Sequence, residues 1–131
     1  MKKYNLILIV TLGFLTISCN KHDEHNHEVT ATINLLEPME NDTIAFGTEL
    51  HMHGTITGSD ELHGYNLSLL NTDNATTLFS ASATNHQTSY SFDEHWVNAA
   101  TDTTHLEVQV EVELDHDGNK TTKSVHLVAL P

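Results

Sequence analysis

Arginine is absent from this sequence, and its basic residues number five against eighteen acidic ones, which gives a formal net charge of −13. So acidic a chain repels the phosphates of nucleic acids and favours cations or basic partners. We therefore expect no nucleic acid among its partners. Catalytic motifs are also lacking: there is no Gly-x-Ser-x-Gly elbow, phosphate-binding loop or His-Glu-x-x-His pair. We predict a protein that is not an enzyme.

Cysteine occurs once, at Cys19, so the chain has no partner for an internal disulfide. A hydrophobic run long enough to span a membrane is missing as well. The apolar segment from Leu6 to Ile17 falls short of the roughly 20 residues that a transmembrane helix needs, and it follows Lys2 and Lys3. A short basic start, an apolar centre and a small residue before the end are typical of a signal peptide, here residues 1–18.

The end of that segment, Leu15-Thr16-Ile17-Ser18-Cys19, resembles the lipobox of bacterial lipoproteins. The family pattern usually has Leu where Thr16 stands. The resemblance implies that Cys19 is acylated, becomes the new N-terminus and anchors the protein to a membrane; several acyl chains give stable anchoring. The alternative is an ordinary secreted protein with an unpaired cysteine.

Next to Cys19 the sequence continues with Asn20, Lys21, His22, Asp23 and Glu24. An early lysine followed by acidic residues is similar to the export tag that one group of Gram-negative bacteria uses for surface lipoproteins. We expect an outer-membrane lipoprotein that faces either the periplasm or the cell surface.

Residues 19–28 are polar, charged and without apolar periodicity, and we interpret them as a flexible tether. Residues 29–131 then form one domain, rich in short stretches of Thr, Val, Leu and Ile that turn residues separate. This pattern predicts an all-β antiparallel sandwich of about seven strands. The predicted strands cover residues 29–36, 49–57, 62–70, 76–83, 88–92, 106–114 and 121–129, with a short edge strand at 43–46.

The clearest strand runs from Leu106 to Leu114 with strict alternation of apolar and polar residues, and a turn at residues 115–119 leads into the last strand. A terminal hairpin and about seven strands in a hundred residues resemble the immunoglobulin-like sandwiches of extracellular bacterial lipoproteins. The likeness is architectural, because the cysteine pair of antibody domains is missing and Trp96 does not lie on the third main strand. Fold alone gives no function.

Histidine, by contrast, is abundant, with eleven residues that all follow Cys19. Three of them, His22, His25 and His27, lie in the tether among carboxylates, a composition typical of weak metal binding. The alternative for this segment is a solvated linker. Since the lipidated cysteine offers no thiolate, any metal must be held by imidazole and carboxylate groups, which suits zinc or copper(II).

Within the domain, His51 and His53 lie two residues apart on a predicted strand and therefore project from the same face. In an immunoglobulin-like order the connection from residue 93 to residue 105 lies at the same end. We therefore expect His95 and His105 to complete a metal site with this pair. The alternative is that these histidines are ordinary exposed polar residues.

Three further histidines, His63, His86 and His116, fall in loops at the opposite end, near acidic residues. They form a second candidate site, although loops are also where soluble proteins ordinarily carry histidine.

The leading hypothesis is a lipid-anchored envelope protein that binds zinc or copper(II) through surface histidines. The competing hypothesis is an adhesion or assembly module that binds an envelope protein or a glycan without metal. A third is a pH response, because many histidines on an acidic surface gain charge below about pH 6.5. The sequence leaves the oligomeric state open.

Overall fold

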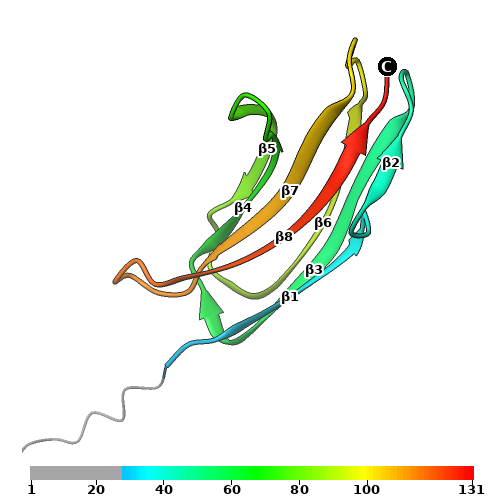
Figure 1. The fold of residues 1–131 in the computed structure, drawn as a ribbon. Coiled ribbons are helices and arrows are strands. Elements are labelled where there is room, and N and C mark those ends of the chain that lie inside the picture. The colour runs from blue at the N-terminus through cyan, green and yellow to red at the C-terminus, as the bar shows by residue number, and fades with distance from the viewer. Residues whose placement is uncertain (1–27) are drawn as a thin grey trace, which may run out of the picture.

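The computed structural model describes residues 28–131, which form eight strands in two facing sheets (Figure 1). The strands are β1 (Ala31–Glu37), β2 (Asp42–Ile44), β3 (Glu49–Leu62), β4 (Gly64–Asn71), β5 (Thr76–Ala83), β6 (Gln87–Val97), β7 (Thr104–Glu113) and β8 (Lys120–Ala129). Within this part of the chain we find no helix with the length and apolar character needed to cross a membrane.

One sheet has the order β1-β3-β6 and the other the order β2-β8-β7-β4-β5. All pairs are antiparallel except the short parallel contact of β2 with β8. If the short β2 is left out of the count, the second strand, β3, pairs with the fifth, β6, and the third strand, β4, lies beside the sixth, β7. This is the strand pairing of immunoglobulin domains. The predicted immunoglobulin-like sandwich is confirmed, and counting β2 brings the strands to eight.

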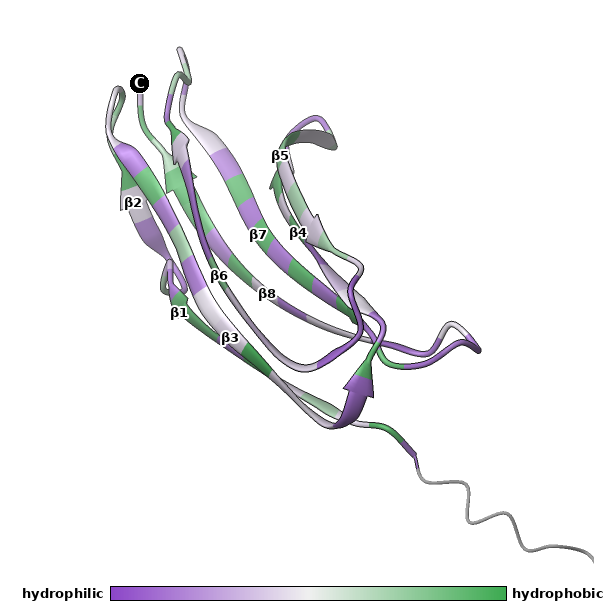
Figure 2. Ribbon diagram, turned by 180° about the vertical axis from the view of Figure 1, so that it is seen from behind, coloured by the Kyte–Doolittle hydropathy of each residue, from purple (hydrophilic) through white to green (hydrophobic). Residues whose placement is uncertain are grey.

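The core lies between the two sheets, where alternate residues of each strand point inward. On β3 the buried positions include Leu50, Met52 and Ile56, and on β7 every second residue from Leu106 to Val112 is nearly inaccessible. Figure 2 shows the resulting bands of hydrophobic and hydrophilic residues along β7. Because successive side chains of a strand point to opposite faces, the same alternation leaves the odd-numbered residues of β3 from Glu49 to Thr57 on the solvent face.

Two strands are longer than the sequence indicates. β6 continues to Val97, so residues 93–96, predicted as part of a connection, are paired with β3. β3 continues to Leu62 through a register irregularity after Thr57, and β4 begins at Gly64 instead of residue 62. Both segments contain acidic residues. Their apolar members, Leu62 and Trp96, pack on the core, while Asp60, Glu61 and Asp93 are exposed, which suits a strand.

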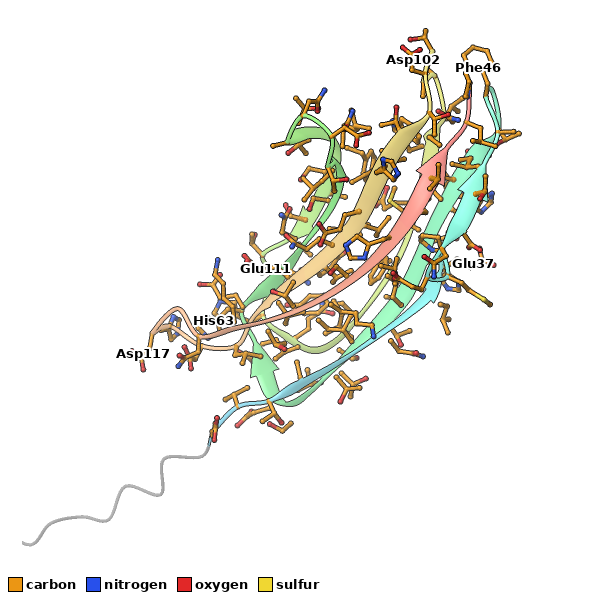
Figure 3. All side chains as sticks on the ribbon, in the orientation of Figure 1. Glu37, Phe46, His63, Asp102, Glu111 and Asp117 are labelled. Carbon is orange, nitrogen blue, oxygen red and sulfur yellow. The ribbon has the colours of Figure 1, made fainter. Side chains whose placement is uncertain are left out.

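The two ends of the sandwich are distinct. The chain enters beside the β7–β8 turn, since Glu28 and Val29 line a pocket together with Asp115 and Asn119. Phe46 lies at the opposite end, as Figure 3 shows. We call these the entry end and the far end.

Asn98 holds the far end together. Its side chain is fully buried; Nδ2 donates hydrogen bonds to the carbonyl oxygens of Ile44 (3.1 Å) and Leu130 (2.9 Å), and Oδ1 accepts one from Ala100 N–H. Its backbone N–H also donates to Thr48 O at 2.9 Å. One side chain thus joins the end of β2, the segment after β8 and the β6–β7 connection.

Candidate metal site on the outer sheet

Glu49, His51 and His95 meet on the solvent face of the β1-β3-β6 sheet, and each contributes one ligand atom to a group whose members lie within 4.8 Å of one another. His51 on β3 lies directly opposite His95 on β6 in the antiparallel register. Their ring centroids are 4.4 Å apart in an edge-to-face arrangement. Glu49 lies two residues before His51 and therefore on the same face.

The Glu49 carboxylate lies between the two imidazoles. Its oxygens are 3.9 Å from His51 Nε2 and 3.5 Å from His95 Nδ1. On the other side of the His95 ring, Nε2 lies 3.6 Å from Asp93 Oδ1. His95 is therefore flanked by two carboxylates on adjacent strands, which raises the local attraction for a cation.

The three side chains are about half exposed, at 51% for Glu49, 49% for His51 and 41% for His95. They can therefore change rotamer without disturbing the core. Tetrahedral zinc holds ligand atoms roughly 3.3 Å apart, given metal–ligand distances of about 2.0–2.2 Å. A small rotation closes the observed group to that spacing, which leaves a fourth position for water. The donor set of two imidazoles and one carboxylate fits zinc or copper(II).

His53 lies on the same face, one row further along β3. In the register it is flanked by Glu37 on β1 and Asp93 on β6. The structure thus brings three of the four predicted domain histidines, His51, His53 and His95, to one sheet surface, with His53 beside the three-residue group.

The fourth predicted residue, His105, lies elsewhere. It is the second residue of β7 in the other sheet, where its side chain points to solvent away from the core. Its backbone N–H donates to Asp73 Oδ2 (2.9 Å), and its Nδ1 lies 3.0 Å from Asp73 Oδ1. The expected convergence with His51 does not occur, because the β6–β7 connection passes from one sheet to the other and the outer faces of the two sheets point in opposite directions.

The contact with His105 changes the acidity of the Asp73 side chain. The pKa of the Asp73 carboxyl is held below its ordinary value, first by the hydrogen bond from the His105 backbone and then by the bond to its ring. His126, on β8 of the same sheet, is bound in a similar way by Glu40, whose carboxylate accepts its backbone N–H (2.9 Å) and lies 3.2 Å from its Nδ1. His105 and His126 therefore contact two different carboxylates, those of Asp73 and Glu40 respectively.

Glu49 was not among the ligands predicted from the sequence, which were all histidines. The signal was present: in Glu49-Leu50-His51-Met52-His53 the three polar residues alternate with two apolar ones, so they share one face of a strand. Asp93 and His95 repeat this spacing on the partner strand. The predicted lipidation residue Cys19 and the tether histidines His22, His25 and His27 lie outside the described residues.

Comparison with known proteins gives a structural similarity alone. The chain matches no protein-family model, and no curated protein sequence matches it either. Among solved structures it is similar to the fibronectin(III)-like modules of Clostridium thermocellum CbhA, with a TM-score of 0.48 and 13% sequence identity over 76% of this chain and 96% of that one.

Proposed function

We propose that this chain is a lipid-anchored envelope protein that binds a divalent transition metal, zinc or copper(II), at Glu49, His51 and His95. The observation that carries the proposal is the pairing of His51 with His95 across two adjacent strands, with the Glu49 carboxylate next to both rings. Rigid paired strands fix the separation of the two imidazoles before metal binds, which lowers the entropy cost of binding.

The electrostatics of the whole chain support this function. With a formal charge of −13, the surface attracts cations over distances beyond direct contact. The sequence places three more histidines, His22, His25 and His27, between the lipobox and the domain. We propose that they bind metal weakly and add to the amount held at the membrane.

Anchoring at Cys19 in the outer membrane is part of the proposal. The domain begins at the entry end, so a lipid at Cys19 leaves the metal site near the far end and exposed to the surrounding compartment. Mass spectrometry of the mature N-terminus tests this: acyl groups on Cys19 are expected, and a Cys19→Ala protein should leave the membrane fraction. An unmodified Cys19 in the mature protein would contradict the anchor.

Calorimetric zinc titration of the full chain in detergent tests the metal site. We expect saturable binding at micromolar zinc and loss of one equivalent in His51→Ala/His95→Ala. The matched control is His105→Ala/His126→Ala, which removes two exposed histidines from the other sheet and should leave that equivalent intact. Equal stoichiometry in both double variants would overturn the site.

Protein binding is the second candidate, and the far end favours it. Phe46 and Val97 are more than half exposed there, at 59% and 55%, beside the partly exposed Leu130. The backbone bonds from Gly47 to Asn98 and from Leu130 to Ile44 hold these three residues at one tip. A partner that co-purifies in the presence of a chelator and is lost in Phe46→Ser/Val97→Ser would support this function in place of metal binding.

A further inference from the structure

Three histidines from three different connections pack against one another at the entry end. His63 lies between β3 and β4, His86 between β5 and β6, and His116 in the β7–β8 turn. The ring centroid of His63 is 4.4 Å from that of His86 and 3.8 Å from that of His116, and His86 and His116 are 5.8 Å apart. Figure 3 shows His63 and Asp117 at this end of the molecule. We propose that these imidazoles form a second transition-metal site, separate from the one on the sheet.

The backbone around His63 is fixed. Its N–H donates to Glu113 O at 2.9 Å, which ties it to the end of β7. The next residue, Gly64, has φ of +139°, and a Cβ there would lie 2.3 Å from Ala83 O. The sharp turn therefore requires glycine, and it directs the partly buried His63 ring toward the other two loops.

A single buried hydroxyl connects the loops of His63 and His86. Tyr90 Oη donates to the carbonyl oxygen of Asn85, the residue before His86, and it lies 3.4 Å from the carbonyl oxygen of Leu62, the residue before His63. The Tyr90 ring belongs to the core, where 7% of the residue is exposed. The spacing of two of the three histidines is thus set from inside the sandwich.

The third loop, the β7–β8 turn that carries His116, is stabilised by the Asp115 carboxylate. Asp115 accepts hydrogen bonds from the backbone N–H groups of Asp117 and Asn119 and from Asn119 Nδ2, which fixes the turn that carries His116. These bonds, with that from Asn119 Nδ2 first, keep the pKa of Asp115 below its ordinary value, and His63 also contributes. Because Asp115 accepts three hydrogen bonds within the turn, we assign it to holding the loop and assign the metal ligands to the imidazoles.

Glu61 orients the imidazole of His86. Its Oε1 lies 3.1 Å from His86 Nδ1, so the tautomer protonated at Nδ1 donates to the carboxylate and leaves the Nε2 lone pair free for a metal. Metal-bound histidines almost always donate the second ring N–H to a carboxylate, a backbone carbonyl or water, and loss of that partner costs about 10–100-fold in metal affinity. Glu61 supplies that partner for His86. His105 and His126 have similar carboxylate contacts but stand alone, whereas His86 belongs to a group of three rings.

The donor set specifies the ligand class. Three neutral imidazoles with an open fourth position suit tetrahedral zinc, and imidazole also suits copper(II). Tetrahedral zinc holds three imidazole centroids roughly 5 Å apart, given zinc–nitrogen distances of about 2.0–2.1 Å. The His86–His116 separation is close to this value. The His63 and His86 rings are stacked, with 20° between their planes, so zinc binding requires the exposed His86 ring to rotate as well as move outward until both lone pairs point at one ion. Glu61 and Asp115 add negative charge next to the cluster.

The test uses the full chain in detergent with His22, His25 and His27 replaced by alanine, so that the tether does not bind zinc. We expect two equivalents of zinc by calorimetry, one of which remains in His51→Ala/His95→Ala. Adding His86→Ala/His116→Ala to that variant should abolish the remaining equivalent. Both residues are exposed, so the fold should survive, which circular dichroism checks. Two results would overturn the loop site without affecting the sheet site. One is zinc still bound when His51, His95, His86 and His116 are all replaced. The other is no zinc bound to His51→Ala/His95→Ala.

Two further variants distinguish a metal site from a group of histidines that only stabilises the loops. Glu61→Gln should weaken the loop site at least about 10-fold and leave the sheet site unchanged. Tyr90→Phe keeps the ring in the core and removes the hydroxyl, and it should also weaken the loop site alone. In nitrogen-15 spectra zinc should shift the Nε2 signal of His86. An Nε2 signal unmoved by zinc would contradict the proposal.

Discussion

His51 on β3 and His95 on β6 stand directly opposite each other, with ring centroids 4.4 Å apart, although 44 residues separate them in the sequence. Neighbouring strands set this distance, and Glu49 reaches both rings from the position two residues before His51. His53, one row away, lies outside the group of three.

This arrangement predicts unequal effects for two histidines on one face. His95→Ala removes a direct ligand and should weaken zinc binding at the sheet site by more than about 100-fold, since loss of a carboxylate that merely orients a ligand already costs about 10–100-fold. His53→Ala should change the affinity less than threefold, by roughly 0.6 kcal/mol or less. Calorimetry in the background that lacks the tether and loop histidines makes the comparison. A larger loss of zinc affinity in His53→Ala than in His95→Ala would show that the ligand is His53 and contradict the assigned site.

Asp73 predicts a pH dependence of stability. Its folded-state pKa lies below the ordinary value of 3.8 because it accepts hydrogen bonds from His105. The resulting stabilisation is therefore present above the unfolded-state pKa and is lost as the pH falls through the folded-state pKa. Urea midpoints between pH 6 and pH 2.5, roughly the range around that titration, should fall more steeply for the natural chain than for Asp73→Asn. Asp102→Asn, in another exposed loop, is the control, and identical slopes in all three proteins would refute the contact.

Asn98→Ala should destabilise the fold by about 1–3 kcal/mol, because it leaves the buried carbonyl of Ile44 without one of its donors and frees the end of β8. Asn34→Ala is the matched control on the exposed face of β1, where a surface change should stay within about 0.5 kcal/mol. Urea denaturation followed by tryptophan fluorescence measures both variants. Equal midpoints for the two would show that Asn98 does not hold the far end together.

Two glycines with positive φ should respond differently to alanine. Gly118→Ala meets no atom within 4 Å, so it should cost only the roughly 1–2 kcal/mol of the left-handed backbone. Gly64→Ala meets Ala83 O at 2.3 Å in addition and should cost clearly more. Thermal unfolding ranks the two variants. If Gly64→Ala were the milder change, the sharp β3–β4 turn that directs His63 would be wrong.

The local pattern of the sequence was sufficient for the sandwich and its core. Alternation along Leu106–Leu114 and Glu49–Thr57 assigns each residue to the core or to the solvent, because successive side chains of a strand point to opposite faces. It therefore predicted correctly that Leu50, Met52 and Ile56 are buried and that His51 and His53 share the outer face. The residues of Asp115–Asn119 likewise predicted the turn between the last two strands.

Which histidines meet was decided by tertiary structure. Register places His95 against His51, and the passage of the chain from one sheet to the other after Val97 takes His105 to Asp73 instead. Neither fact is local, because pairing depends on how two strands far apart in the sequence align. The cluster of His63, His86 and His116 likewise needs three connections to end at the same place. The sequence determined that histidine and carboxylate are the side chains available to hold a metal in this domain, and only the packing of the sheets decided which of them lie close together.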